Sequence, residues 1–275
     1  MTQPNQYDWS LLNRDYSDIV QKVLADWKQL VASDEREPEF QRFLSEYAGM
    51  FFGAEGTSLV VSQLQLGTAY RPDFVVAHDI RSGGVLYEFI ELKRPCHSPF
   101  NNGGTESHPL KLALKQVGNW QARLMENCVE VRERFPVTRA ADRRCSFTII
   151  IGRRENSKDW LSERNQLSDR LTNRYRHNIR SYDYLTDELV KRQFARGSPV
   201  WLSGDELTLN QLANPFVKAF TDKSWRELVK GVGRASQDGL AVFEAHFLTC
   251  SGKEVAKRLK HNALFEQFIA RQIQK

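Results

Sequence analysis

The sequence lacks several features that would assign it to a specialised class of protein. Its four cysteines lie far apart with no C-x-x-C pair, so we expect reduced thiols rather than a disulfide framework. Its apolar runs, such as residues 147–151, have the length of a core strand and are too short to span a bilayer. Residues 1–15 are polar and contain no apolar run typical of a secretory signal. We therefore expect a cytoplasmic protein with no membrane partner.

Two kinds of cofactor motif are also missing. No G-x-x-x-x-G-K-[ST] run occurs, so any nucleotide hydrolysis that activity requires would come from another chain. Cys96, His97 and His108 carry metal-binding side chains, but a second closely spaced ligand pair is absent from the sequence. This spacing disfavours a zinc site.

The composition is that of an ordinary globular protein with an excess of positive charge. With 275 residues, 41% hydrophobic and 27% charged, the chain can form a core and still carry an extension. The net charge of +5 permits nucleic-acid binding without requiring it. Seven arginines lie between positions 153 and 180, and Arg153, Arg154 and Arg174 are candidates to contact a phosphate backbone. The alternative is a solvated helix face whose arginines pair with acids.

The spacing of apolar residues predicts an α/β protein with a mixed sheet flanked by helices. Helices are predicted over residues 16–31, after Asp34 (a capping box with Glu37 three residues later) and over residues 109–127. Strands are predicted over residues 58–66, 74–78, 85–93 and 146–151, and an extended piece turning into a helix over residues 179–185. We expect an N-terminal helical segment (residues 1–33), a central domain (34–198) and a mainly helical C-terminal extension (199–275).

Three charged residues mark the two strands predicted at residues 74–78 and 85–93. A glycine-rich turn separates these strands, so they are expected to form a β-hairpin. Side chains alternate along a strand, which places Glu91 and Lys93 on one face. Hairpin pairing carries Asp73 to the same end, so two carboxylates and one ammonium should converge there.

Such a set suits the hydrolysis of a phosphodiester. A divalent cation would neutralise developing charge and supply hydroxide, and Mg²⁺ (with Mn²⁺ as a substitute) needs only one or two protein carboxylates. Asp73 and Glu91, with the backbone carbonyl of Leu92, are the candidate ligands. Lys93 is the candidate to hold the attacking water or to stabilise the transition state. The alternative is a charged strand end that is only solvated.

Two further residues are candidates for supporting roles. Gln116 lies four residues before Trp120 on a predicted helix, so the amide could orient the water or a phosphate oxygen while the ring packs beneath the site. The alternative is a surface amide beside a core tryptophan. Glu37 could supply a third acidic group over the site, although a plain capping residue would show the same pattern.

These residues together resemble a known family. Arg71-Pro72-Asp73-Phe74, Glu91-Leu92-Lys93 and Gln116-x-x-x-Trp120 resemble the PD-(D/E)XK nuclease superfamily. Glu37-x-x-x-Gln41-x-Phe43-Leu44 and Ser181-Tyr182-Asp183-Tyr184-Leu185 make residues 34–189 similar to the Shedu anti-phage nuclease domain.

The resemblance implies a restriction-endonuclease-like fold, Mg²⁺-dependent cleavage of DNA, a role in bacterial defence and homo-oligomerisation. It carries over Asp73 and Glu91 as metal ligands, Lys93 as the catalytic lysine, and Gln116 and Glu37 as supporting residues. Two features depart from the family pattern: Trp120 stands where tyrosine is expected, and the extension follows the nuclease domain instead of preceding it.

We therefore expect a metal-dependent DNA endonuclease or nickase. A different class of function would be a non-catalytic nucleic-acid-binding or sensing module with a nuclease-like fold, and a third would be a purely structural α/β interaction protein. An intact Asp, Glu and Lys set argues against the second class, and the third predicts no salt-dependent affinity for DNA.

Overall fold

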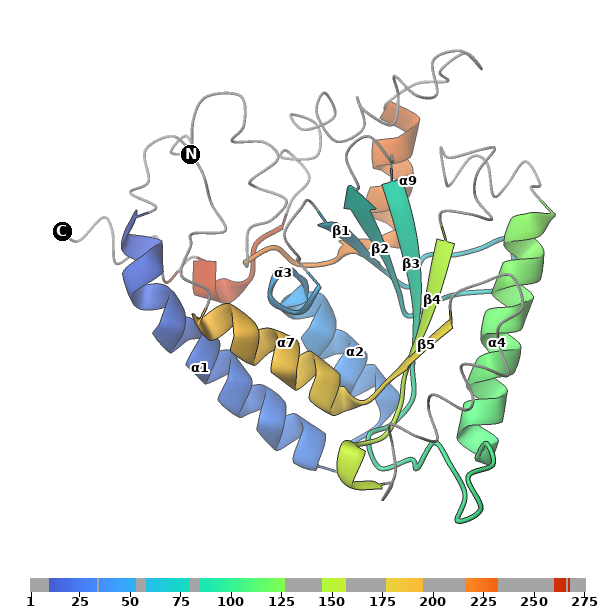
Figure 1. Ribbon diagram of the computed structural model, residues 1–275. Coiled ribbons are helices and arrows are strands. Elements are labelled where there is room, and N and C mark those ends of the chain that lie inside the picture. The colour runs from blue at the N-terminus through green and yellow to red at the C-terminus, as the bar shows by residue number, and fades with distance from the viewer. Residues whose placement is uncertain are drawn as a thin grey trace.

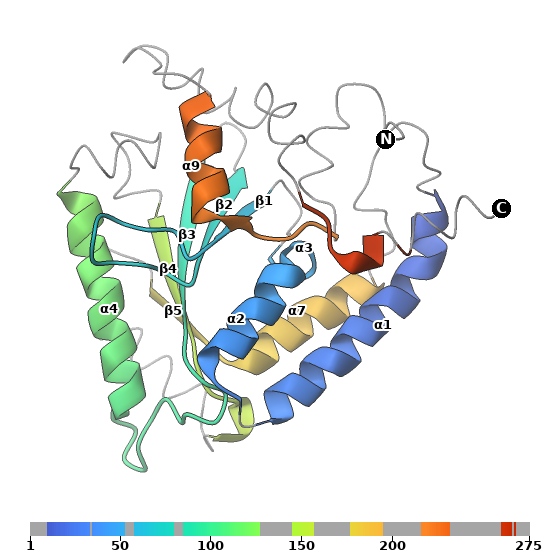
Figure 2. The same ribbon diagram turned by 180° about the vertical axis from the view of Figure 1, so that it is seen from behind.

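The computed structural model describes residues 10–33, 35–52, 58–79, 85–126, 145–156, 177–194, 216–231, 260–265 and 267. These residues form a mixed sheet of six strands in the order β5-β4-β3-β2-β1-β6, with helices against both faces (Figures 1 and 2). The expected α/β class, a mixed sheet flanked by helices, is confirmed.

The sheet contains both antiparallel and parallel pairs. Its strands are β1 (Ser58–Ser62), β2 (Phe74–Asp79), β3 (Val85–Leu92), β4 (Cys145–Ile150), β5 (His177–Arg180) and β6 (Phe220–Thr221). β2 pairs antiparallel with β1 and with β3, which confirms the predicted pairing of the hairpin strands. β3, β4 and β5 run parallel to one another, and β6 runs parallel to β1.

Helices cover the two faces of the sheet unequally. They are α1 (Ser10–Ala32), α2 (Glu37–Glu46), α3 (Ala48–Phe51), α4 (His108–Met125), α7 (Tyr182–Phe194) and α9 (Asp222–Gly231), with a 3₁₀ turn at Arg154–Asn156. α4 packs on one face, whereas α1, α2, α3 and α7 pack on the other (Figure 1). In the described part of the chain, no helix combines the length and the apolar character needed to cross a membrane.

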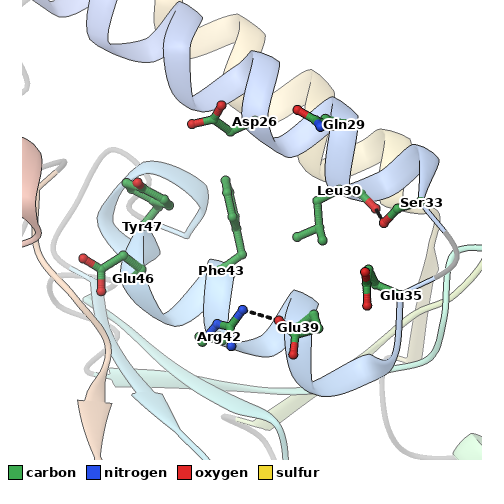
Figure 3. A pocket seen from close by; sticks show the side chains of 10 residues that line it. All are labelled: Asp26, Gln29, Leu30, Ser33, Glu35, Glu39, Arg42, Phe43, Glu46 and Tyr47. Atoms are coloured by element: carbon green, nitrogen blue, oxygen red, sulfur yellow. Dashed lines mark hydrogen bonds and ion pairs between the residues drawn. The ribbon is translucent and has the colours of Figure 1, made fainter.

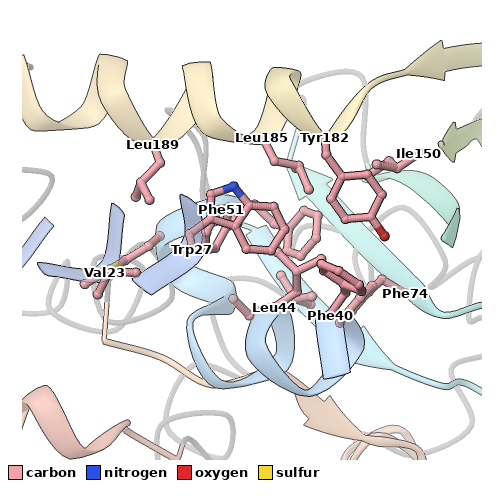
Figure 4. Packing of buried hydrophobic residues seen from close by; sticks show 14 of the residues in the cluster. Val23, Trp27, Phe40, Leu44, Phe51, Phe74, Ile150, Tyr182, Leu185 and Leu189 are labelled. Atoms are coloured by element: carbon pink, nitrogen blue, oxygen red, sulfur yellow. The ribbon is translucent and has the colours of Figure 1, made fainter. Parts of the chain in front are cut away.

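Strand alternation divides the apolar side chains between two cores. Tyr87 and Phe89 of β3 face α4 and pack with Trp120. Ile90 and Leu92 point the other way, into a core built around Trp27 of α1. Figure 4 shows Trp27 among other members of this core. Because β3 is buried on both faces, the position of its last residues is well determined, and those residues carry the charges of interest.

Two local predictions were wrong. The capping box does not form, because α2 begins at Glu37 after an N-cap residue, Arg36, that makes no side-chain cap. Pro38 lies in its first turn, where the fixed φ of proline favours helix initiation without a cap. The first strand ends at Ser62 instead of residue 66, because Gln63 has a left-handed φ of 52° that an extended strand does not continue through.

The described part of the C-terminal region packs onto the same sheet. β6 extends the sheet beside β1, and α9 follows it directly. Phe220 and Trp225 join the core beneath α4, and Phe216 and Leu264 join the core around Trp27. Most of the C-terminal extension, which is expected to be mainly helical, lies outside the described residues, and the proposed division into three regions stays a prediction.

Candidate active site

Asp73 lies just before β2, at the end of the hairpin where the strand ladder stops. Pairing of β2 with β3 ends at Phe74 and Ile90, so Leu92 extends past the last paired residue of β2. The Asp73 Oδ2 atom accepts a hydrogen bond from the backbone N–H of Leu92 at 2.8 Å. The carboxylate therefore takes the place of a strand partner and is held against the end of β3, as hairpin pairing predicted.

Glu91 and Lys93 meet at the same end of the sheet. The Lys93 Nζ atom lies 2.7 Å from Glu91 Oε1, and the two side chains are only 13% and 4% exposed. Their backbone is fixed as well, because Lys93 donates its N–H to the carbonyl of Ile150 in β4 at 2.8 Å. A buried pair of this kind is screened little by solvent, so its charges act strongly on any group that enters the site.

Burial and repulsion shift the pKa values of the two carboxyl groups upward. Burial raises the pKa of Asp73 to about 6, against the lowering effects of the Leu92 N–H and of Lys93. Burial and the charge of Asp73 raise the pKa of Glu91 to about 8. For Lys93, burial works against the charged form, but Glu91, Glu37 and Asp73 together raise its pKa. The site thus holds two acids that repel each other and a lysine that stays charged.

Glu37 approaches this group from α2. Its Oε2 atom lies 3.7 Å from Lys93 Nζ, and its side chain is 37% exposed. α2 is anchored to the end of β1 one turn further on, where Gln41 donates to Ser62 and accepts from Gln63. Residues four apart share a helix face, so this anchor holds Glu37 over the end of the sheet. Glu37 thus lies beside Lys93, and its role as a third acidic group over the site stays a prediction.

The donor set fits a hard divalent cation. In the described part of the chain, no three His, Cys, Asp or Glu side chains gather closely enough to hold a metal ion by themselves. Mg²⁺ does not require three, because it keeps several waters and binds through one or two carboxylates. Asp73 and Glu91 supply those carboxylates, and their mutual repulsion is what a bound cation would relieve. The carbonyl of Leu92 stays the predicted third ligand.

The other predicted site residues lie outside this group. Gln116 is exposed on α4, whereas Val117 and Trp120 of the same helix are buried, so its supporting role stays a prediction. Trp120 packs in the core on the face of the sheet that α4 covers, which corresponds to the alternative of a surface amide beside a core tryptophan.

The predicted phosphate-binding arginines are engaged with acids where the structure describes them. Arg153 Nε lies 3.1 Å from Asp183 Oδ1, and the Arg154 side chain pairs with Asp187 of α7. This arrangement corresponds to the alternative of arginines paired with acids. Arg174 lies outside the described residues, and a role of these arginines in binding nucleic acid stays a prediction.

A separate groove of about 580 Å³ lies between α1 and α2 (Figure 3). Leu30, Phe43 and Tyr47 line it together with one arginine, Arg42. Its acidic residues are Asp26, Glu35, Glu39 and Glu46. Four carboxylates with one arginine repel phosphate, so this groove is a poor candidate for a nucleic-acid site.

One buried side chain near the site gave no usable signal in the sequence. The Ser181–Leu185 segment was singled out for its resemblance to a family pattern, and nothing in its spacing indicated that a tyrosine would be buried within the field of the carboxylates. In the structure Tyr182 is buried at the start of α7, and its pKa is raised well above the usual range by burial and by the charges of Asp73 and Glu37.

Comparison with known proteins adds one finding to this geometry. A family model described as Shedu protein SduA, C-terminal, matches residues 34–186, more than half of the chain. The matched region includes Glu37, Asp73, Glu91 and Lys93 and reaches into α7. No curated protein matches the chain. The converging carboxylates and lysine thus lie within the matched region, which corresponds to the C-terminal part of SduA. The match shows that this chain belongs to the Shedu family.

Proposed function

We propose that this chain is a metal-dependent nuclease of the PD-(D/E)XK superfamily that hydrolyses phosphodiester bonds in DNA as an endonuclease or nickase. The observation that carries the proposal is the convergence of Asp73, Glu91 and Lys93 at one end of the sheet. Membership of the Shedu family indicates an anti-phage defence context. DNA as substrate, a homo-oligomeric active form and a restriction-endonuclease-like fold are further parts of the proposal.

The carboxylates would bind the metal. Asp73 and Glu91 would hold Mg²⁺ or Mn²⁺, with the Leu92 carbonyl completing the protein's share of the ligands. When bound, the cation neutralises charge on the phosphate and supplies a hydroxide near neutral pH. Binding would favour the ionised form of both acids, whose pKa values are raised in the metal-free protein.

Lys93 would act on the reacting phosphate. It carries a positive charge at neutral pH, because the acids around it raise its pKa above the usual value. A charged ammonium at this position can hold the attacking water by hydrogen bonding and stabilise the negative charge that grows on the phosphoryl oxygens. Glu37 Oε2, 3.7 Å from Lys93 Nζ, favours the protonated form of the lysine. The same attraction keeps the Lys93 side chain within the site.

The first test is the cleavage of supercoiled plasmid and of short linear duplexes by wild type and Lys93→Ala in Mg²⁺, in Mn²⁺ and in EDTA. We expect metal-dependent cleavage by the wild type and a loss on the order of 100-fold or more in Lys93→Ala, the range for removing a group that stabilises transition-state charge. The matched control is Lys218→Ala, which removes a lysine paired with Glu46 at 2.7 Å in another part of the molecule.

Two results would contradict the proposal. One is equal cleavage by wild type and Lys93→Ala, which would place any activity elsewhere or in a contaminant. The other is steeply salt-dependent DNA binding without cleavage in any metal, which would favour the nucleic-acid-binding module instead.

A further inference from the structure

The hydroxyl of Tyr182 is buried without a hydrogen-bond partner among the described residues. The ring itself is well packed: it stacks on Trp27 with centroids 5.7 Å apart and meets Phe40 edge-on at 5.1 Å (Figure 4). Phenylalanine would make the same ring contacts with Trp27 and Phe40. A buried hydroxyl without a partner, by contrast, costs free energy. The oxygen atom therefore calls for an explanation that the apolar core does not provide.

The backbone directs this side chain into the core that adjoins the site. Tyr182 donates its N–H to the carbonyl of Gly152 at 3.0 Å, which fixes the start of α7 beside the end of β4. From there the side chain enters the core that contains Phe74 and Leu92. The backbone N–H of Leu92 in turn holds the Asp73 carboxylate at 2.8 Å. Figure 4 shows the hydroxyl pointing away from α7, on the side of the cluster where Phe74 lies.

Electrostatics agree with this direction. After burial, the largest contributions that raise the pKa of Tyr182 come from the negative charges of Asp73 and Glu37. The hydroxyl therefore lies within the field of two of the acids that define the site. A phenol in such a field keeps its proton and acts as a hydrogen-bond donor.

We propose that the Tyr182 hydroxyl donates a hydrogen bond to a water held among Asp73, Glu37 and Lys93, and so is a positioning residue that orients a metal-bound water. This inference rests on the proposed function of the site. A buried water is stable when two to four polar groups surround it, and two carboxylates, one ammonium and one hydroxyl meet that requirement. The orphaned hydroxyl would then have its partner in the working site.

The test compares Tyr182→Phe with Tyr87→Phe in the full chain. Both variants remove one buried phenolic oxygen, but Tyr87 lies in the core on the opposite face of the sheet. Thermal unfolding first establishes that both variants fold. Mn²⁺ affinity is then measured by calorimetry, and plasmid cleavage is measured in parallel. We expect Tyr182→Phe to weaken Mn²⁺ binding and cleavage about 10-fold, because the loss of a group that orients the surroundings of a metal commonly has an effect of this size. Tyr87→Phe should change neither quantity.

The outcomes separate this inference from the proposed nuclease function. If the wild type binds Mn²⁺ and cuts DNA, and Tyr182→Phe does both equally well, the inference is overturned and the nuclease stands. Equal losses in Tyr182→Phe and Tyr87→Phe would also overturn it, because the effect would then be one of core packing. A third outcome is that the wild type binds Mn²⁺ but cuts no DNA, while Tyr182→Phe binds Mn²⁺ more weakly than the wild type. That outcome supports the inference and contradicts the nuclease function. A wild type that binds no Mn²⁺ overturns both.

Discussion

The Asp73 carboxylate and the backbone N–H of Leu92 are joined by a 2.8 Å hydrogen bond that closes the end of the β2–β3 hairpin. Asp73 thus has two tasks: it supplies a negative charge to the site, and it satisfies a donor that the strand ladder does not reach. The two tasks can be separated by substitution.

Asp73→Asn and Asp73→Ala are expected to differ in stability but not in activity. Asparagine keeps an oxygen that can accept from Leu92 and removes a charge that repels Glu91, whereas alanine leaves the Leu92 N–H without its acceptor. We expect Asp73→Ala to be less stable than Asp73→Asn by about 1–3 kcal/mol in urea unfolding, and both to lose cleavage. Equal stability of the two variants would show that the hydrogen bond contributes nothing.

The stability of the metal-free protein should fall as the pH rises through the neutral range. Glu91 has a pKa raised from 4.5 to about 8 in the fold, and Asp73 has a pKa raised from 3.8 to about 6. Between the unfolded and the folded pKa values, the folded protein therefore keeps protons on these carboxyl groups that the unfolded chain has released. The stabilisation is complete below the unfolded pKa values and is lost as the pH rises through the folded ones.

This pH dependence can be measured as the Tm between pH 4.5 and about 8 in EDTA. Glu91→Gln should remove most of the fall in Tm, because its side chain does not titrate. Adding Mg²⁺ at the upper end of the range should raise the Tm of the wild type, since a cation stabilises the folded state by binding to it. A Tm profile that Glu91→Gln leaves unchanged would assign the pH dependence to other groups.

Glu37→Gln should lower cleavage with little effect on stability. Glu37 contacts Lys93 at 3.7 Å from a partly exposed position, and such pairs contribute about 0–1 kcal/mol to folding. We expect cleavage to fall roughly 3- to 10-fold, since a difference of 1.4 kcal/mol corresponds to a factor of ten. Glu39→Gln is the control: it lies in the same first turn of α2 but pairs with Arg42 and lines the groove. Similar losses in both variants would point to a general charge effect.

Substitution by alanine is expected to change stability in opposite directions at two glycines. Gly152 has a φ of +66°, and a Cβ there would lie 2.5 Å from the carbonyl oxygen of His97, so Gly152→Ala should destabilise by about 1–3 kcal/mol. Gly118, in α4, has open space around its Cβ position, so Gly118→Ala should stabilise by about 0.5–1 kcal/mol. Urea unfolding measures both. A neutral Gly152→Ala would mean that the loop after β3 can move aside.

Asp187→Asn should strengthen DNA binding if the arginine segment contacts phosphate. The substitution releases Arg154 from its ion pair in α7, so the salt dependence of DNA affinity should become steeper by up to about one unit of slope. Asp26→Asn removes the same charge from the acidic groove and should leave the slope unchanged. Identical slopes for Asp187→Asn and the wild type would remove Arg154 from the set of candidate contacts.

The residues that could be predicted from sequence are those whose position follows from local periodicity. Alternation along β3 places Glu91 and Lys93 together, and antiparallel pairing of adjacent strands brings Asp73 to them. The same reasoning could not foresee β6, because two residues carry no period and the pairing joins distant parts of the chain. The start of α2 was predicted wrongly, since Asp34 suggested a cap where Pro38 makes one unnecessary. Nothing local could show that Tyr182 would be buried with an unpartnered hydroxyl within the field of Asp73 and Glu37.

The parallel pairing of β1 with β6 has a consequence for synthesis on the ribosome. Val61 pairs with Phe220, so the outer edge of β1 is covered only after roughly 160 further residues have been made, which takes about 10–30 seconds at ordinary elongation rates. In that interval the nascent chain already contains Asp73, Glu91 and Lys93, but it presents a bare strand edge to which other chains can add. The newly made chain is therefore protected against pairing at this edge only once the segment that carries β6 has been made.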